Sequence, residues 1–438
     1  MRVVVIGGGF GGLATAARLA KTGHRVTLLE RSTGLGGALA TRSRDGFAWD
    51  AGPTTTLLPA VVRDLFRKTG RPLEREVDLE PVDPLREHRF ADGSTLALPG
   101  GSRAGQVAAF EALGPGLGRS WTAYVDPLAD DWELLRRDYL ERPWDPTFAP
   151  RELTARLTGR EVLHRRLRKA FSDERLRQVA ALPFTADGHD LRNVPAWAGV
   201  VSYLEQRFGS WRVPGGMAGL GLALVRRLET RGVEVLTSTP ALDVVVRDGR
   251  AVAVATPSGR IDADAVVCAI DPRRLPALAT YVRATMPAIP PVVAHVGLEG
   301  GVPDLAGEVV LHPGDPVKEP LLIVRPGGTA PEGAHAWTVL GRGRLSEDVL
   351  VALARRGLDV RQRLVTRLDL SPRDLVDEWG GSPLGVLWQG RSTVTRRLGP
   401  TTPVPGVYAA GAHATPGSGL PYVGLSAALV AQAIGPAG

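Results

Sequence analysis

The first thirty residues contain three segments with different patterns of apolar residues. Residues 2–6 are a short apolar run after one arginine, residues 13–20 are rich in alanine, and residues 25–29 are a second apolar run. Short apolar runs predict buried strands, and alanine favours a helix. Five glycines and Phe10 stand between the first strand and the helix. The pattern predicts a strand, a glycine turn, a helix and a second strand that ends at Glu30.

Apolar runs far downstream predict strands that return to this unit. Residues 244–254 alternate around an Asp-Gly step at 248–249, which favours a hairpin. Residues 265–270 form a further run, and residues 404–411 form another that ends in glycine. A small-residue helix is expected from about residue 422 to 434. The chain therefore predicts an α/β fold in which one domain is assembled from separate segments and the intervening residues form a second domain.

The glycine turn has the spacing of a dinucleotide-binding unit. Gly7 permits the tight turn, Gly9 lets the backbone approach a pyrophosphate, and Gly12 lets the helix pack closely on the sheet. The helix N-terminus then offers unpaired N–H groups and a positive dipole end to the phosphates. Glu30 stands where a carboxylate accepts hydrogen bonds from ribose hydroxyls. Strand, helix and acid together predict a bound dinucleotide.

Composition narrows the function classes only a little. The chain has 438 residues, 44% hydrophobic and 23% charged, which is ordinary for a globular enzyme. The net charge of +7 comes mainly from arginine, as GC-rich coding gives, and the aromatic content of 5% offers no stripe for nucleic acid. Cys268 lies in an apolar run and is expected to be a small core residue. A single cysteine excludes a disulfide framework and a cysteine-based metal site, and we expect no metal.

The start of the chain and its apolar runs indicate a cytoplasmic protein. The first strand begins at residue 2 without a charged segment before it, and no run reaches about 18 apolar residues. A predicted helix before residue 171 carries basic residues opposite its apolar side: Arg160, Arg165, Arg166, Arg168 and Lys169. A solvated face is the simpler interpretation, and peripheral membrane contact is the alternative. Nothing indicates the oligomeric state.

Taken together, these motifs make the chain resemble the phytoene desaturase-type FAD-dependent oxidoreductases, which are related to the flavin amine oxidases. The similar stretches cover about half of the chain: residues 3–30, 36–37, 45–54, 202–220, 232–271 and 402–429. The resemblance implies a Rossmann-like FAD-binding domain, of the two-dinucleotide-binding glutathione reductase type, interleaved with a largely helical or mixed α+β substrate domain. The FAD-binding domain would comprise residues 1–74, 210–274 and 385–438, and the substrate domain residues 75–209 and 275–384.

The resemblance also implies the FAD contacts and a lipophilic small-molecule substrate. Ala241 would lie near the adenine, and the segment after Gly411 near the flavin. The implied cofactor-binding residues are Gly7, Gly9, Phe10, Gly11, Gly12, Glu30, Arg31, Gly36, Gly37, Pro53, Thr54, Ala241, Gly411, Ala412, Leu420, Pro421, Tyr422 and Val423.

Three departures from the family pattern bear on the substrate. Ala38 replaces the basic residue that usually follows the paired glycines, and Arg42 or Arg44 are its possible substitutes. The histidine of the last loop has moved to His413, and Tyr422 stands where the family often has glycine. The chain is also shorter than typical carotenoid desaturases. These departures leave FAD in place and weaken the case for a long C40 substrate.

The absence of a second nucleotide-binding motif indicates where the flavin takes its electrons from and where it passes them. The second glycine cluster, Gly215-Gly216, lacks a strand–helix context, so we expect no nicotinamide nucleotide site. The flavin should take hydride from an organic substrate and pass the electrons to oxygen or a quinone. His413 and Tyr422 are the catalytic candidates, although a loop histidine bound to backbone explains His413 equally well. Four aromatic residues are candidates either for the cavity wall or for the core: Trp197, Tyr203, Phe208 and Trp211.

Two alternatives remain open at this point. A flavin amine oxidase often uses a lysine near the flavin, and only Lys318 lies in the downstream half of this chain. A non-catalytic lipid carrier with the architecture of the Rab GDP-dissociation inhibitors is the alternative from another class. The intact glycine motif with Glu30 favours the enzyme, because a carrier needs no dinucleotide site.

Overall fold

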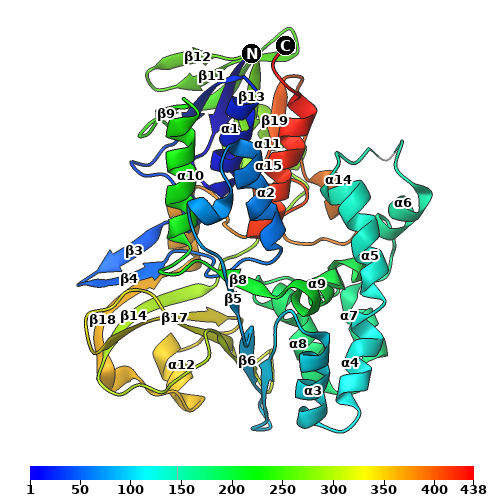
Figure 1. The fold of residues 1–438 in the computed structure, drawn as a ribbon, viewed down its shortest axis with the longest axis vertical. Coiled ribbons are helices and arrows are strands. Elements are labelled where there is room, and N and C mark those ends of the chain that lie inside the picture. Colours follow the sequence, from blue (N-terminus) through cyan, green and yellow to red (C-terminus); the bar gives the residue numbers. More distant parts are fainter. Residues whose placement is uncertain (146) are drawn as a thin grey trace.

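A five-stranded parallel sheet forms the upper part of the molecule (Figure 1). The computed structural model describes residues 1–145 and 147–438. The strand order is β19-β13-β1-β2-β9. The bounds are β1 (Arg2–Ile6), β2 (Arg25–Leu29), β9 (Glu234–Leu236), β13 (Ala265–Cys268) and β19 (Val407–Ala409). The sheet confirms that strands near residues 265 and 407 return to the N-terminal unit, and Cys268 is buried in it.

Helices cover one face of this sheet, and a small antiparallel sheet covers the other. On the first face α1 packs between its neighbours, and the helices are α1 (Phe10–Lys21), α2 (Pro59–Thr69), α10 (Ala218–Thr230) and α15 (Leu420–Ile434). On the second face lie β10 (Asp243–Arg247), β11 (Arg250–Thr256), β12 (Gly259–Asp262) and α11 (Pro276–Val282). The hairpin is confirmed, because Asp248 and Gly249 have φ of 49° and 73°, as its tight turn requires.

A seven-stranded sheet lies below, and two-stranded ribbons adjoin it. Its order is β18-β14-β17-β16-β15-β6-β7. The bounds are β6 (Arg86–Arg89), β7 (Thr95–Leu98), β14 (Val292–Glu299), β15 (Val309–Leu311), β16 (Leu321–Pro326), β17 (Ala334–Arg342) and β18 (Leu364–Leu370). The ribbons pair β3 (Thr41–Arg44) with β4 (Phe47–Asp50), and β5 (Glu80–Val82) with β8 (Ser210–Arg212).

Residues 275–384 are rich in strands, which fits the mixed α+β form of the expected substrate domain and not the largely helical one. They supply five of the seven strands, β14 to β18. β14 shows the reason. Its residues 293–298 are buried on both faces of the sheet, and its β-branched valines favour a strand. The α-helices in this segment are short: α11, α12 (Val349–Arg355) and α13 (Pro372–Trp379).

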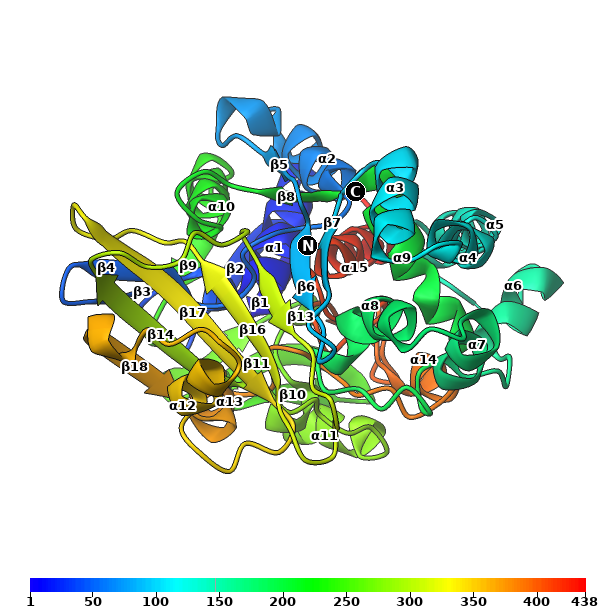
Figure 2. The ribbon, with the colours of Figure 1, turned by 90° about the horizontal axis from the view of Figure 1, so that it is seen from below.

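A helical region stands beside the seven-stranded sheet, as Figure 2 shows from below. It comprises α3 (Arg103–Leu113), α4 (Leu117–Val125), α5 (Leu128–Leu135), α6 (Arg151–Leu157), α7 (Leu163–Ala170), α8 (Glu174–Thr185) and α9 (Val201–Phe208), with α14 (Thr393–Arg396) nearby. Its core is aromatic, with Phe110 stacked on Trp121 at 4.3 Å between centroids. Among the described residues, no helix is both long and apolar enough to cross a membrane.

Candidate functional site

One large cavity, of about 600 Å³, adjoins both sheets. It is lined by the glycine turn after β1, by segments within residues 30–40 and 50–54, by the loops around residues 186–187, 269–271, 380–384 and 411–420, and by one face of the seven-stranded sheet. The carboxyl ends of parallel strands are the usual ligand site of such α/β sheets. The cavity therefore lies where the sequence predicts a dinucleotide.

The glycine turn leaves free space where a pyrophosphate would lie. A Cβ placed on Gly9 would meet no protein atom within 4 Å, so a side chain there would extend into the cavity. A Cβ on Gly12 would instead overlap the carbonyl oxygen of Gly7, and one on Gly11 would lie 2.9 Å from Cα of Gly411. The three glycines thus serve two purposes. Gly9 keeps the cavity open, whereas Gly11 and Gly12 let the backbone segments pack closely.

Two helices begin at the cavity wall with free N-termini. No described side chain caps α1 at Gly9 or α15 at Gly419, and neither helix has an acidic residue in its first turn. The positive ends of both helix dipoles therefore face the cavity with no acidic side chain in the first turn of either helix. This arrangement fits one bound group with negative charge at two places, as a flavin dinucleotide has.

Glu30 lies at the end of β2 with its carboxylate in the cavity wall. It accepts hydrogen bonds from the backbone N–H of Gly8 at 2.7 Å and of Ser32 at 2.7 Å. The oxygen that accepts from the Ser32 N–H also accepts from the Ser32 hydroxyl at 2.8 Å, whereas the oxygen that accepts from Gly8 keeps a second lone pair. The acid is therefore held in place and can still accept a hydrogen bond from a ribose hydroxyl.

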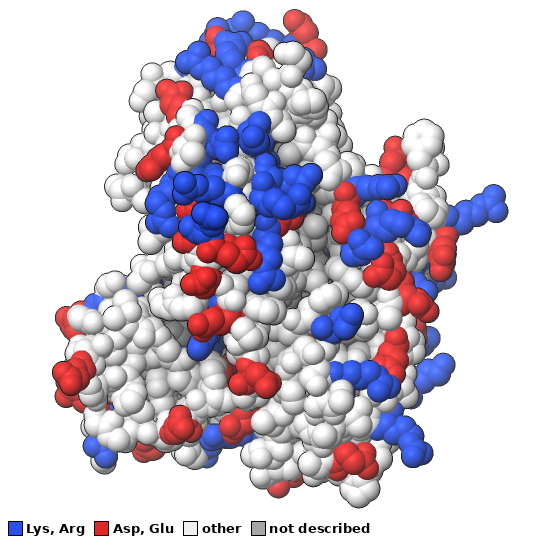
Figure 3. Space-filling model, in the orientation of Figure 1, with Lys and Arg blue, Asp and Glu red and all other residues white. Residues whose placement is uncertain are grey.

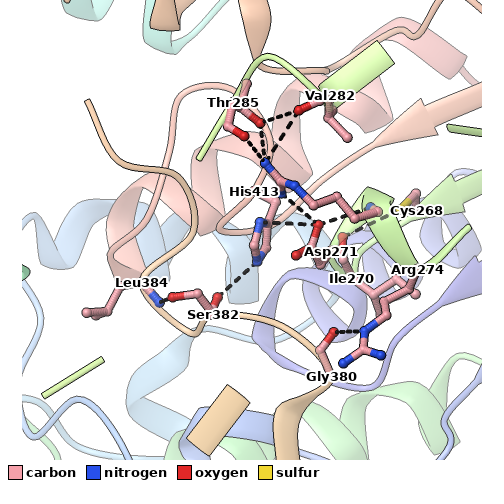
Figure 4. A network of polar contacts seen from close by, with 11 residues as sticks. Cys268, Ile270, Asp271, Arg274, Val282, Thr285, Gly380, Ser382, Leu384 and His413 are labelled. Carbon is pink, nitrogen blue, oxygen red and sulfur yellow. Dashed lines mark hydrogen bonds and ion pairs between the residues drawn. The ribbon is translucent and has the colours of Figure 1, made fainter. Parts of the chain in front are cut away.

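His413 lies at the cavity between two partners (Figure 4). Its Nε2 donates to the carbonyl oxygen of Ser382 at 2.9 Å, which fixes the hydrogen on Nε2 because a carbonyl only accepts. Its Nδ1 is 3.8 Å from Oδ1 of Asp271 and has no hydrogen-bond partner among the described residues. Burial lowers the pKa of His413, and Asp271 opposes that effect. At neutral pH the ring is therefore an uncharged base with a free Nδ1 lone pair.

Asp271 is in turn oriented by its own neighbours. It accepts hydrogen bonds from the backbone N–H and the guanidinium of Arg273, each at 3.0 Å. That guanidinium also contacts Thr285 (Figure 4). Asp271 and Ser382 belong to no recognisable motif and lie in different loops, so the sequence does not predict their place beside His413.

Most of the implied cofactor-binding residues line the cavity. They are Gly7, Gly9, Phe10, Gly11, Glu30, Arg31, Gly36, Gly37, Pro53, Thr54, Gly411, Ala412, Leu420 and Val423. Gly12 lies beneath the turn, and Ala241 packs against the core on the other side of the sheet. Pro421 and Tyr422 are also absent from the lining. The contact of each residue with FAD stays a prediction.

Tyr422 points away from the cavity that it was expected to serve. Leu420 and Val423, three residues apart, share the cavity face of α15, while Tyr422 is rotated toward the helical region and packs against its core. Burial raises the pKa of Tyr422 to about 12, so the phenol stays protonated. Its assignment as a residue near the reacting bond finds no support in this geometry.

Other candidates also lie elsewhere. Arg42 pairs with Glu378 at 2.8 Å, and Arg44 donates to a backbone carbonyl, so neither guanidinium replaces the basic residue missing at Ala38. The four aromatic residues proposed for the wall do not line the main cavity. Trp197 belongs to the core of the helical region, and Tyr203 and Phe208 pack against that core. Trp211 packs against Arg63.

Comparison with known proteins identifies the family. The family of flavin-containing amine oxidoreductases matches residues 10–435. The chain belongs to this family. Hydroxyneurosporene desaturase of Cereibacter sphaeroides is 30% identical over 487 aligned positions, covering 99% of this chain and 97% of the relative. A 4,4'-diapolycopene oxygenase of a Methylomonas species is 27% identical over 99% of this chain and 98% of its own length.

Solved structures agree on the fold. Putrescine oxidase bound to putrescine has a TM-score of 0.70 at 18% identity, with 99% of each chain covered. Cyclohexylamine oxidase of Brevibacterium oxydans has a TM-score of 0.66 at 17% identity, again over 99% of each chain. The chain is therefore an FAD-dependent oxidoreductase of the phytoene desaturase type, within the amine oxidase superfamily. The open space at Gly9 and the two free helix N-termini fit FAD.

Proposed function

We propose that the enzyme removes two hydrogens from a carbon–carbon single bond of an apolar isoprenoid. The cavity wall carries this proposal, because the middle of the sheet face that lines it is apolar: Val293, Leu321, Ile323 and Leu340. The names of the relatives, a hydroxyneurosporene desaturase and a diapolycopene oxygenase, support an isoprenoid substrate. Binding should then grow with the apolar area that the substrate buries.

The reaction balances without a further co-substrate at the carbon centre. Two C–H bonds break, one carbon–carbon π bond forms, one hydrogen leaves as hydride and the other leaves as a proton. When bound, FAD would supply the two-electron acceptor for the hydride, with oxygen or a quinone as the final oxidant. The protein has to hold the substrate, exclude water and take up the proton.

His413 is the residue that we assign to the proton. Its Nε2–H is held by the Ser382 carbonyl, and its Nδ1 is buried beside Asp271 with a lone pair that has no hydrogen-bond partner among the described residues. When Nδ1 takes up a proton, the carboxylate of Asp271, 3.8 Å away, stabilises the resulting imidazolium. The backbone contact that made His413 resemble an ordinary loop histidine therefore also orients its free nitrogen.

The two alternatives fit the site less well. No lysine is among the described residues that line the cavity, and Lys318 is exposed and pairs with Asp315 at 3.3 Å, so the lysine of a typical amine oxidase has no counterpart here. A lipid carrier would have no use for the open cradle at Gly9. The amine oxidases among the structural neighbours support the shared fold and no particular substrate.

Peripheral membrane contact stays a proposal for how such a substrate arrives. The charged residues on α7 are partly paired, since Arg166 lies 3.6 Å from Asp131. The densest basic cluster on the face seen in Figure 3 lies over α2 and α10, with Arg67, Lys68 and Arg226 exposed. Flotation with anionic and neutral liposomes tests this point, and flotation with neither would refute it.

Turnover on a matched panel tests the proposed function. Hydroxyneurosporene and 4,4'-diapophytoene represent the apolar class, and putrescine and cyclohexylamine represent the amines. We expect new conjugated double bonds in at least one polyene and no flavin reduction by either amine. Good activity on putrescine, with none on a polyene, would refute the proposal and favour the amine oxidase branch.

A further inference from the structure

Three neighbouring strands form the cavity wall that faces the cofactor edge. β17 is in the middle, with β14 on one side and β16 on the other. Leu340 lies opposite Val293 of β14 and Ile323 of β16. Alternate side chains of a strand point to the same face, so the residues two positions from this row share the face, and they too line the cavity.

The wall is apolar in its middle row and carries an arginine at each end. At one end Thr338 lies between His295 and Arg325, and at the other Arg342 lies beside Leu321. Thr338 and Arg342 are four residues apart, which corresponds to about 13 Å along the strand. The wall therefore matches a molecule with an apolar body and a polar group at its end.

The arginine at the first end is already neutralised by protein acids. Arg325 Nε donates to Glu308 at 2.8 Å. Glu308 also pairs with Arg86 at 3.2 Å, and Arg86 pairs with Glu205 at 2.5 Å. Two acids thus balance two guanidinium groups, so Arg325 already has its counter-ion.

Arg342 at the other end is held by backbone instead of by an acid. Its Nε donates to the carbonyl oxygen of Ala186 at 3.1 Å, and its Nη1 donates to that of Ile289. Its Nη2 is buried and has no partner among the described residues. Gly188, with φ of +81°, makes room for the guanidinium, because a Cβ there would lie 2.7 Å from Nη1. The backbone therefore holds this arginine in place, and its Nη2 donor has no partner among the described residues.

The acid that shares this end of the cavity is a weak counter-charge. Asp187 lines the cavity near Arg342. Burial raises the pKa of Asp187 to about 6, although Arg342 and Arg325 oppose that shift. Most of Asp187 is therefore ionised at neutral pH and offsets part of the charge of Arg342, but the unpaired Nη2 donates no hydrogen bond to it.

We propose that Arg342 binds a carboxylate at one end of the substrate, whose apolar body lies across Val293, Leu340 and Ile323. This inference rests on the proposed function, since it names the head group of the apolar molecule that the enzyme oxidises. The Nη2 without a partner among the described residues calls for a hydrogen-bond acceptor, and a carboxylate accepts from a guanidinium with good geometry.

A binding experiment with matched head groups tests the inference. All-trans retinoic acid, its methyl ester and retinol share one apolar polyene body, and each is titrated into the holoenzyme by calorimetry. We expect the acid to bind at least about tenfold more tightly than the ester, because a charge-assisted hydrogen bond is stronger than a neutral one. Equal affinities for acid and ester would overturn the inference and leave the proposed function standing. Failure of all three to bind would count against both.

Two variants locate the effect at Arg342. Arg342→Gln should bring the acid and the ester within about threefold of each other, and Arg342→Lys should keep part of the preference. Arg344→Gln is the matched control, because it removes the same charge from an exposed residue outside the cavity lining. A preference that survives Arg342→Gln, or that is lost in Arg344→Gln, would overturn the assignment. If Arg342→Gln fails to fold, the wild-type comparison and Arg342→Lys still decide.

Discussion

Replacing Gly9 with valine should abolish FAD binding without unfolding the protein. Gly9 has φ of −76° and ψ of 177°, an extended conformation that any residue adopts, and a Cβ there meets no protein atom within 4 Å. The valine side chain would instead occupy cavity space in front of the first N–H groups of α1. The perturbation therefore acts on the ligand and leaves the packing of the glycine turn intact.

The expected loss of affinity follows from the hydrogen bonds that the valine blocks. A hydrogen bond to a charged group contributes about 1.5–3 kcal/mol, so losing two phosphate contacts costs about 3–6 kcal/mol. Since about 1.4 kcal/mol corresponds to tenfold, the FAD dissociation constant should rise by about 10²- to 10⁴-fold. Alanine at the same position should have a smaller effect, because only one methyl group enters the cavity.

The assay compares FAD affinity with the stability of the apoprotein. FAD is removed, rebinding is followed by quenching of flavin fluorescence, and thermal unfolding of the apoprotein is recorded by circular dichroism. Gly12→Ala is the contrasting variant, because its Cβ would overlap the Gly7 carbonyl and should lower the apoprotein Tm. Undiminished FAD affinity in Gly9→Val would refute the proposed cradle. A large drop in its apoprotein Tm would refute the claim that Gly9 faces open space.

Three further predictions concern electron flow, proton uptake and acid stability. Mixing the oxidised holoenzyme with NADH or NADPH alone in a stopped-flow instrument should leave the flavin oxidised, and fast bleaching at micromolar nucleotide would contradict the absence of a nicotinamide site. His413→Gln should keep FAD and lower kcat by about 10²- to 10⁴-fold. Because burial lowers the His413 pKa, wild-type activity should fall only below about pH 6.5, and this loss of activity at low pH should be absent in the variant. The buried pair of His88 and His312 is neutral in the fold, since burial lowers both pKa values, that of His312 to about 3. Unfolding free energy should therefore fall as pH drops below about 6.5, by up to about 1.4 kcal/mol per pH unit for each imidazole, and replacing both by leucine should flatten this slope in pH-dependent denaturant melts. An unchanged slope would show that other groups carry the acid sensitivity.

The FAD-binding part of the fold could be predicted because its signals are local. The glycine turn, the helix after it and Glu30 lie within thirty residues, and the Asp248-Gly249 turn fixes the hairpin by its own conformation. Each of these features depends on backbone geometry that a few neighbouring residues determine. The strand at 265–268 followed from a simple apolar run.

The cavity wall could not be predicted because its residues acquire their roles through strand pairing. Arg325 and Arg342 look like ordinary surface charges in the sequence, and only the pairing of β16 with β17 brings both onto the cavity face. Asp271 and Ser382, which lie in loops more than a hundred residues apart from each other, both contact His413. Tyr422 was misjudged because one step along a helix turns a side chain by about 100°.

The most direct test of the account is an anaerobic half-reaction of the holoenzyme with a polyene substrate. The loss of oxidised flavin absorbance is measured together with the amount of new conjugated product after addition of 4,4'-diapophytoene. The account predicts one carbon–carbon double bond formed for each flavin reduced, with reduction slowed by about 10²-fold or more in His413→Gln. Flavin that stays oxidised with the polyene and is reduced by putrescine would contradict the central claim.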